Sequence, residues 1–133
     1  NTQLYDGIAN TLAMLSPLAE LAVVTNKPES LSIRLLEALQ IHDHFATVIG
    51  GDSAPRAKPF ADPLHEAVKR TGQGGPVIMI GDSPGDIACA AAFGCPVIWC
   101  AWGYAADHGA LAPTYIAQQP SAIVDLARRI LHR

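Results

Sequence analysis

The sequence lacks the features that would place it in several specialised classes of protein. No apolar run approaches the ~20 residues that a helix needs to cross a bilayer, so no membrane partner is expected. Charged residues make up only 16% of the chain and the net charge is -3, which leaves no electrostatic reason to expect binding to nucleic acid. The composition predicts an ordinary globular domain, and it leaves the oligomeric state open.

Metal-binding patterns of cysteine and histidine are also missing. The three cysteines form neither a CxxC pair nor an even set, which favours buried thiols in a reducing cytosol. The five histidines are scattered without the spacing of metal ligands. We therefore expect a cytoplasmic protein without a zinc site.

What is present is a regular alternation of apolar segments and polar turns. Half of the 133 residues are apolar, enough for one domain with a single packed core over residues 1–133. Strand-length apolar runs occupy residues 21–24, 47–50, 77–80, 97–99 and 115–117. Helical patterns occupy residues 8–15, 31–39, 62–72, 83–94 and 123–131. Asp62 is expected to be the N-cap of the third helix, with Pro63 at its first position and Gly72 at its end. The alternation predicts an α/β fold, a parallel sheet with helices on both faces.

Polar residues follow the predicted strands, where ligands bind in an open parallel sheet. Thr25 and Asn26 end the first strand, so a hydroxyl and backbone N–H groups there suit a phosphate. Alternatively, Asn26 only caps the helix that begins near Pro28. Lys58 precedes Pro59, which limits its backbone conformation, and a fixed ammonium group would neutralise a phosphate. The competing interpretation of Lys58 is a solvated surface lysine.

The segment GDSPGD, residues 81–86, joins the third predicted strand to a helix. With Ser83 as N-cap and Pro84 at the first helical position, Asp86 falls at the third, so a purely structural role in a capping box is a full alternative for it. Asp82 projects from the end of an apolar strand, where a carboxylate costs desolvation free energy unless a cation or donors compensate it. Because Mg²⁺ prefers oxygen ligands and keeps several waters, it is the expected partner of Asp82.

Together these segments resemble three motifs of a known family. VVTNKP, GGDSAPRAKPFADPL and IGDSPGDIACAAAFGCPVIWCAWGY are similar to the second, third and fourth motifs of the haloacid dehalogenase-like superfamily, within its phosphoglycolate phosphatase group. The resemblance covers nearly all of the chain, and the aromatic-rich turn with Gly103 and Tyr104 makes it specific. It implies a three-layer Rossmann-like core that lacks the first, central strand of the family.

The resemblance also implies a role for each candidate residue. In this superfamily an aspartate of the first motif attacks the substrate phosphorus, and water then hydrolyses the aspartyl-phosphate. Carried over to this sequence, Thr25 and Asn26 would hold the phosphoryl oxygens, while Lys58 would neutralise the nucleophile and the phosphate. Asp82 would bind Mg²⁺, and Asp86 would support the metal site through water or Lys58. Lys58 and Asp82 would thus be the catalytic residues, and these roles suit phosphoryl transfer, which needs positioning, countercharge and a metal.

The first motif itself, DxDGT, is absent, because no two aspartates are separated by a single residue. The segment LYDGIANTL has leucine where the motif needs its first aspartate, and it matches the family's re-entry helix after the cap. One missing amino-terminal segment would hold both the motif and the cap, so we expect the chain to be an amino-terminally truncated part of a longer protein. Family sheet order places the missing strand between the strands ending at Val24 and Ile80, which would otherwise have unpaired edges.

The function that the resemblance implies is a Mg²⁺-dependent phosphatase for small phosphate monoesters, most like phosphoglycolate phosphatase, with a small phosphorylated metabolite as its partner. A sugar-phosphate mutase of the same superfamily is the alternative enzyme, and the cap would decide between the two. A truncated member that binds a partner or phosphate without catalysis is the non-enzymatic alternative. Dehalogenases fit less well, because they lack the phosphate-handling pattern. The 133-residue chain alone is predicted to be inactive, because it lacks the covalent nucleophile.

Overall fold

The computed structural model describes residues 7–72, 74–102, 109 and 111–132. Helices and strands alternate as the sequence predicts, except that no described helix lies between β4 and β5. In chain order they are α1 (Ile8–Leu15), β1 (Ala22–Val24), α2 (Glu29–Ala38), η1 (His42–His44), β2 (Thr47–Ile49), α3 (Asp62–Thr71), β3 (Met79–Gly81), α4 (Pro84–Phe93), β4 (Val97–Cys100), β5 (Tyr115–Ala117) and α5 (Pro120–Leu131). Gly103 and Tyr104, which belong to the resemblance of the fourth motif, lie outside the described residues. None of the helices in these ranges is long and apolar enough to span a membrane.

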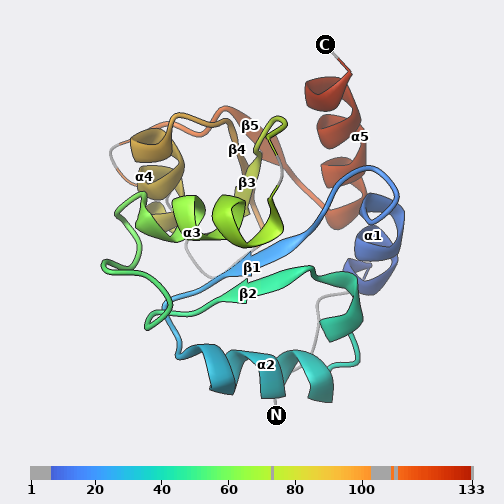
Figure 1. The fold of residues 1–133 in the computed structure, drawn as a ribbon. Helices are drawn as coiled ribbons and strands as arrows, with labels where there is room; N and C mark the ends of the chain where they lie inside the picture. Colours follow the sequence, from blue (N-terminus) through green and yellow to red (C-terminus); the bar gives the residue numbers. More distant parts are fainter. Residues whose placement is uncertain (1–6, 73, 103–108, 110, 133) are drawn as a thin grey trace.

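The described strands form two parallel sheets (Figure 1). β1 pairs with β2, and β4 lies between β3 and β5. Parallel neighbours need a crossover connection, which α2 supplies for β1 and β2 and α4 for β3 and β4. The predicted α/β fold with parallel strands is confirmed, and within the described part of the chain no strand joins β1 to β3.

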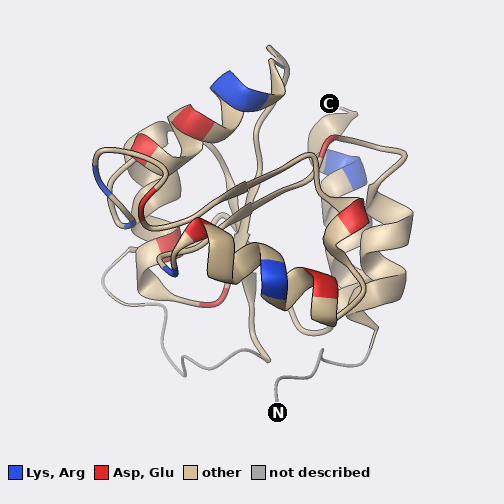
Figure 2. Cartoon of the chain, turned by 60° about the horizontal axis from the view of Figure 1, so that its bottom comes forward, with Lys and Arg blue, Asp and Glu red and all other residues tan. Residues whose placement is uncertain are grey.

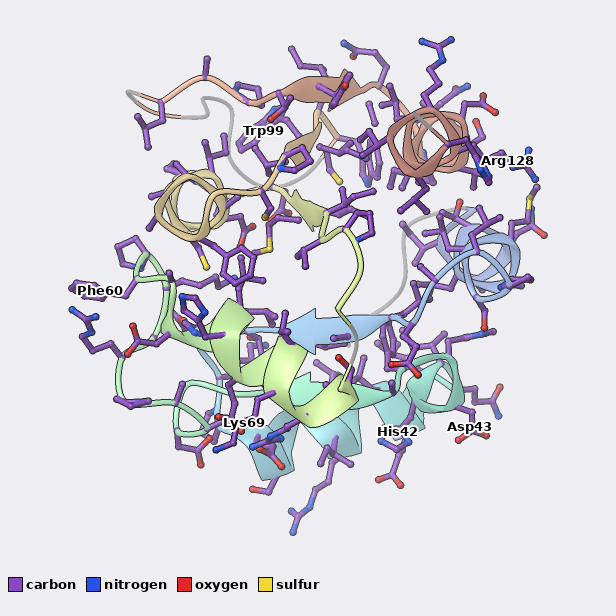
Figure 3. The ribbon with its side chains drawn as sticks, turned by 45° about the horizontal axis from the view of Figure 1, so that its top comes forward. His42, Asp43, Phe60, Lys69, Trp99 and Arg128 are labelled. Atoms are coloured by element: carbon purple, nitrogen blue, oxygen red, sulfur yellow. The ribbon has the colours of Figure 1, made fainter. Side chains whose placement is uncertain are left out.

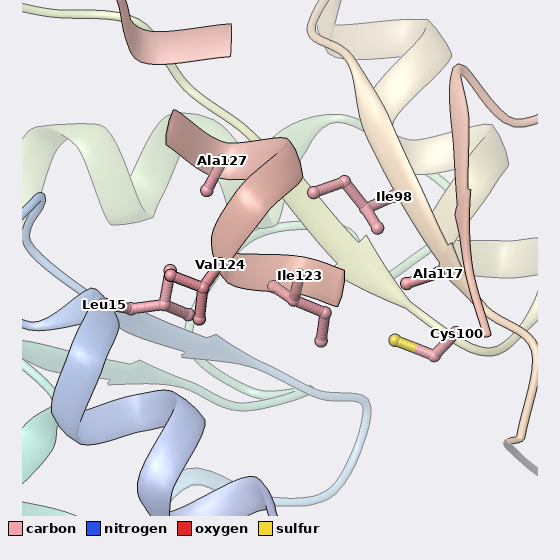
Figure 4. Close-up of a cluster of buried hydrophobic side chains, with 7 residues drawn as sticks. All are labelled: Leu15, Ile98, Cys100, Ala117, Ile123, Val124 and Ala127. Atoms are coloured by element: carbon pink, nitrogen blue, oxygen red, sulfur yellow. The ribbon is translucent and has the colours of Figure 1, made fainter. Parts of the chain in front are cut away.

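The larger sheet packs against a different set of helices on each face. In β4, Val97 and Trp99 pack with α3 and α4, whereas Ile98 and Cys100 pack with α5 and α1. Successive side chains of a strand point to opposite faces, so this strand of four buried residues serves both layers. Trp99 is a buried core residue. Figure 4 shows the cluster on the α5 side, which comprises Leu15, Ile98, Cys100, Ala117, Ile123, Val124 and Ala127.

The smaller sheet continues the same three layers. Val24 joins the cluster on the side of α3 and α4, whereas its neighbour Val23 packs with Leu36 of α2 and Val48 of β2. The layers are therefore α3 with α4, the strands, and α1 with α2 and α5. Charged residues lie on the helices and connecting loops, and the strands carry no Asp, Glu, Lys or Arg (Figure 2).

Two helix ends follow the sequence signals. At α4, the Ser83 hydroxyl accepts the Asp86 N–H at 3.2 Å and the Asp86 carboxylate accepts the Ser83 N–H at 3.2 Å, which is the predicted capping box. Gly72 and Gly94 end α3 and α4 with φ angles of 69° and 95°. Glycine adopts this left-handed conformation without the steric cost that a Cβ atom would add.

The predicted N-cap at Asp62 is wrong. α3 begins at Asp62 itself, and its N-cap, Ala61, offers no side-chain hydrogen bond. The Asp62 carboxylate instead accepts hydrogen bonds from Arg56 Nη2 at 3.0 Å and Nε at 3.3 Å, and these bonds lower the pKa of Asp62. Two charge-assisted bonds outcompete one bond to a backbone N–H. The same guanidinium lies 4.3 Å from the ring centre of Phe60, which Figure 3 shows at the periphery of the molecule.

Candidate active site

The five predicted site residues gather at the carboxyl ends of the strands. Asn26 contacts Lys58, Lys58 contacts Asp86, and Asp86 accepts the backbone N–H of Asp82. Thr25 lies beside Asn26 and directly follows the carbonyl group that Lys58 also binds. The contacts run from the end of β1 to the end of β3, and so bridge the two sheets.

Lys58 is held at its ammonium group. Nζ donates to Asp86 Oδ1 at 2.6 Å and to the backbone carbonyl of Val24 at 3.2 Å. The Lys58 side chain is only 15% exposed and that of Asp86 only 7%, so the interpretation of Lys58 as a solvated surface lysine is wrong. A largely buried ion pair needs hydrogen bonds to satisfy its remaining polar groups, and the Val24 carbonyl provides one of them. The peptide bond between Lys58 and Pro59 is cis.

Both carboxylate oxygens of Asp86 accept hydrogen bonds. Oδ1 accepts from Lys58, and Oδ2 accepts the N–H groups of Asp82 at 3.0 Å and Ser83 at 3.2 Å. A Cβ atom on Gly81 would overlap this carboxylate, so only glycine fits at that position without rearrangement. Asp86 therefore has the structural role in the cap that the sequence suggests and, in addition, holds Lys58. Its place in a metal site stays a prediction.

Thr25 and Asn26 leave β1 in a tightly bonded turn. The Thr25 N–H continues the sheet by donating to the Ile49 carbonyl at 2.9 Å, and the Thr25 hydroxyl accepts the Lys27 N–H at 3.2 Å. Asn26 does not cap α2, because its side chain binds the backbone of Lys58, at 3.0 Å to the N–H and 3.2 Å to the carbonyl. The interpretation of Asn26 as a mere helix cap is therefore wrong. Binding of phosphoryl oxygens by Thr25 and Asn26 stays a prediction.

Asp82 is the predicted ligand of a divalent cation. It directly follows β3 and is half-buried. Within the described ranges, no group of three or more His, Cys, Asp or Glu side chains converges as metal ligands. Mg²⁺ is commonly bound through one or two carboxylates together with water and substrate phosphate, so Asp82 fits this ion better than a closed four-ligand zinc site. Its role as a ligand stays a prediction.

The loops after β1 and β2 pack against each other through glycine. A Cβ atom on Gly51 would overlap the carbonyl group of Asn26, and one on Gly50 would overlap the backbone of Glu29. The close approach allows the Gly51 N–H to donate to the Lys27 carbonyl at 2.7 Å. Asp52 then reaches the start of α2, where its Oδ1 accepts the Glu29 N–H at 2.8 Å. The cap that Asn26 does not provide thus comes from Asp52, on a different loop.

An ion-pair network behind these loops was not expected from the sequence. Glu29 Oε1 accepts the Ser53 hydroxyl at 2.6 Å and pairs with Arg70 Nη2 at 3.0 Å. Arg70 also pairs with Glu66 at 3.0 Å and donates to the Val48 carbonyl at 3.1 Å. The hydrogen bond from Ser53, followed by that from Arg70, lowers the pKa of Glu29. Only the spacing of Glu66 and Arg70, four residues apart on one helix, carried a sequence signal for any of these contacts.

The three cysteines are unpaired, as expected. Cys89 and Cys100 are buried and Cys95 is half-buried. Burial raises the pKa of Cys89 to about 11, even though the Lys58 ammonium nearby opposes the shift. Because the thiolate is the reactive form, Cys89 is a packing residue of the site and not a nucleophile.

Two hollows on the surface lie away from these residues. The first hollow, of about 480 Å³, is lined by residues of α1 and the start of α5. The second, of about 380 Å³, is lined by residues 16–21 and 43–46. Neither is lined by a predicted site residue. The ion pair of Lys58 with Asp86, together with the backbone contact of Asp82, therefore locates the candidate site away from these two hollows.

The sequence matches one family of known proteins. Residues 1–100 match the family described as haloacid dehalogenase-like hydrolase. The chain belongs to the haloacid dehalogenase-like hydrolase family. The resemblance to its phosphoglycolate phosphatase group is confirmed, because the chain is 36% identical over 130 residues to the phosphoglycolate phosphatase of Chromobacterium violaceum and 41% identical over 105 residues to that of Escherichia coli K12.

A solved haloacid dehalogenase-like structure extends the agreement to the fold. The crystal structure of a predicted phosphoglycolate phosphatase from Haemophilus somnus 129PT superposes with a TM-score of 0.83 at 30% identity, covering 93% of this chain and 57% of that one. The two sequence matches cover 96% and 77% of this chain but 58% and 42% of the respective relatives. The chain thus spans about half the length of the curated relatives that it matches.

Proposed function

We propose that the intact protein is a Mg²⁺-dependent phosphatase of small phosphate monoesters, with phosphoglycolate as the leading candidate substrate. The observation that carries the proposal is the position of the Lys58 ammonium group, held by Asp86 and the Val24 carbonyl at the carboxyl end of β1. A fixed cation beside a strand end that offers a hydroxyl, with a second carboxylate at Asp82, suits a phosphoryl group. The names of the relatives support phosphoglycolate as the substrate.

The nucleophile, we further propose, is an aspartate on a strand outside these 133 residues that lies between β1 and β3. Support comes from the two sheets, which no described strand connects, and from Lys58, which joins the end of β1 to Asp86 in the helix after β3. A carboxylate placed there would lie close to the ammonium group. The share of the relatives that the chain leaves unmatched is long enough to contain such a strand and a substrate-selecting cap.

The reaction would proceed in two displacements at phosphorus. The aspartate oxygen forms a bond to phosphorus while the bond to the substrate alkoxide breaks, and the alkoxide takes up a proton. Water then attacks phosphorus, the bond to the aspartate oxygen breaks, and inorganic phosphate leaves. The Thr25 hydroxyl and the backbone N–H of Asn26 would orient the phosphoryl oxygens, and Lys58 would compensate their charge. Asp82 would hold Mg²⁺, which supplies further charge compensation at the phosphoryl group when bound.

The test uses the protein encoded by the complete reading frame, including any segment upstream of Asn1. Purified protein should release phosphate from 2-phosphoglycolate in the presence of Mg²⁺ and lose this activity in EDTA. Asp82→Asn should lower kcat/KM roughly 100-fold, and Asp125→Asn, on the exposed side of α5, should leave it unchanged. Robust Mg²⁺-dependent turnover by residues 1–133 alone would overturn the external nucleophile.

Other outcomes separate the alternatives. A complete protein that isomerises sugar phosphates faster than it hydrolyses them would be a mutase. A reading frame without a DxD element, with no turnover, would favour a binding protein without catalysis. The cytoplasmic location and the absence of nucleic-acid and membrane partners stay predictions.

A further inference from the structure

We infer that the Asn26 side chain is a positioning residue for Lys58, one that sets where the ammonium group lies relative to Thr25. The inference rests on the proposed function, because it concerns the same site. It gives the Asn26 side chain a role distinct from direct contact with a phosphoryl group.

Asn26 binds both backbone polar groups of a single residue 32 positions away. Its Oδ1 accepts the Lys58 N–H at 3.0 Å, and its Nδ2 donates to the Lys58 carbonyl at 3.2 Å. A side-chain amide has one acceptor and one donor side by side, which matches these two groups. Aspartate at position 26 could accept only the first bond and would place a carboxylate oxygen against the carbonyl, whereas alanine could make neither.

The end of β1 therefore holds Lys58 at both ends of its side chain. Asn26 fixes the main chain of Lys58, and the Val24 carbonyl accepts from its ammonium group at 3.2 Å. Thr25 lies between these two residues in the chain. Because the lysine side chain is long and flexible, fixing only its tip leaves several backbone positions open, and fixing both ends removes that freedom. The distance from the ammonium group to the Thr25 hydroxyl is thus constrained by Val24 and Asn26 on either side of Thr25, together with the ion pair to Asp86.

A contribution to overall stability does not explain the two Asn26 hydrogen bonds well. Asn26 is exposed, and hydrogen bonds in contact with water contribute little to the free energy of unfolding. The start of α2 is capped by Asp52, so that role is already filled. What the two bonds do constrain is the loop that carries Lys58.

The test follows the Lys58 signals in the complete protein, labelled selectively with ¹⁵N-lysine. Residues 1–133 contribute three lysines, Lys27, Lys58 and Lys69, and the signals that disappear in Lys58→Arg are those of Lys58. In Asn26→Ala, exchange of the Lys58 amide with solvent should accelerate about tenfold, as expected for one lost hydrogen bond, and the Lys58 ammonium signal should shift or broaden. Lys69, on α3, serves as the internal reference, and Asn10→Ala, an exposed asparagine of α1, is the matched control.

Asn26→Asp separates the two bonds. It retains the acceptor for the Lys58 N–H, so amide exchange should stay within about threefold of wild type, while the ammonium signal still moves because the bond to the carbonyl is lost. In the complete protein, both variants should lower kcat for 2-phosphoglycolate about tenfold or more, with a smaller change in KM and an unchanged melting temperature.

The outcomes distinguish the inference from the proposed function. Unchanged Lys58 amide and ammonium signals in Asn26→Ala would overturn the positioning role, as would altered signals with wild-type turnover. If Asn26→Ala fails to fold, rapid exchange of the Lys58 amide in the wild type, or an unmoved ammonium signal in Asn26→Asp, would overturn it. If the complete protein turns over no phosphate ester while the signals respond as expected, the proposed function fails and the coupling of Asn26 to Lys58 survives.

Discussion

The two sheets of the molecule share apolar packing but differ in the polar contacts around their loops. The sheet of β3, β4 and β5 is apolar: β4 has four consecutive buried residues, and the side chains of Ile98 and Ala117 are fully inaccessible. The sheet of β1 and β2 ends in loops bound by polar side chains, among them Asn26, Ser53 and Arg70. Burial therefore stabilises both sheets, since Val48 and Ile49 of β2 are buried as well, and the smaller sheet adds hydrogen bonds that also place the site residues.

The pair of Lys58 and Asp86 connects the two regions. Lys58 comes from the loop after β2, and Asp86 from the helix after β3. Both side chains of this polar contact are largely buried. Variants that weaken the two regions separately should therefore lower the free energy of unfolding by different amounts, and these losses should depend differently on pH.

The largest loss of stability is expected from the centre of the larger sheet. Ile98→Ala removes a side chain with no solvent exposure and should lower the free energy of unfolding by about 4 kcal/mol, measured by urea denaturation. Ile116→Ala, at a β5 position that is 52% exposed, should change it by less than about 0.5 kcal/mol. Equal losses at the two positions would contradict the assignment of stability to burial.

Removing the charge that joins the two regions should have the next largest effect. Lys58→Met leaves the Asp86 carboxylate buried without its countercharge and should cost about 3 kcal/mol. Lys69→Met, on α3 (Figure 3), is the matched control and should stay within about 0.5 kcal/mol of wild type. If both variants were equally stable, the ion pair would contribute nothing to the connection.

The polar network of the smaller sheet should contribute less. Arg70→Met removes bonds to Glu29, Glu66 and the Val48 carbonyl, and because these groups are partly exposed the expected cost is about 1 kcal/mol. Added salt should shrink the difference from wild type. Arg34→Met, on the exposed side of α2, is the control. If Arg70→Met lowered the free energy of unfolding as much as Ile98→Ala does, this polar network would contribute as much to stability as the core of the larger sheet.

Lowering the pH should remove part of the stabilisation that the Arg70 network provides. Hydrogen bonds from Ser53 and Arg70 lower the pKa of Glu29 in the folded protein below its ordinary value of 4.5. Its contribution is therefore fully present above about pH 4.5 and is lost as the pH falls from there through the folded pKa, because the unfolded chain binds the proton first. Glu29→Gln should reduce the slope of stability against pH below about pH 4.5, whereas Glu20→Gln should not.

The last prediction concerns the chemical reactivity of the three thiols, which lie in the larger sheet or close to it in the chain. Burial raises the pKa of Cys89 to about 11 and that of Cys100 to about 12. At about pH 8, iodoacetamide should modify neither in the folded protein and both in urea, as read by peptide mass spectrometry. Half-buried Cys95 should react first. Rapid alkylation of Cys100 in the native state would show that the apolar region opens more readily than its packing indicates.

The sequence predicted those parts of the molecule that depend on local pattern. Strand and helix alternation follows from hydrophobic periodicity, and the capping box at Ser83 and Asp86 follows from spacing within one turn. The position of Thr25 and Asp82 at the ends of strands follows from topology, because parallel strands end at the same edge.

Contacts between distant loops could not be predicted in this way. Asn26 meets Lys58 across 32 positions, and Glu29 meets Ser53 across 24, with no periodic signal between them. The expected cap at Asp62 failed for a related reason: Arg56, six residues earlier, binds the carboxylate first. A side chain that has two possible partners is assigned by three-dimensional geometry, which a single sequence does not contain.

Arg70 has a further consequence, for how this protein behaves at high concentration. β2 pairs with β1 on one side, and the Val48 carbonyl points to the other, outer side, where Arg70 Nη1 donates to it at 3.1 Å. A strand from another molecule that approaches this edge meets a guanidinium group where it would need a free carbonyl. Proteins use charged side chains at sheet edges to discourage such intermolecular pairing. The same arginine that ties α3 to the sheet therefore also covers the Val48 carbonyl at the outer edge of β2, and we expect it to disfavour pairing with a strand of another molecule.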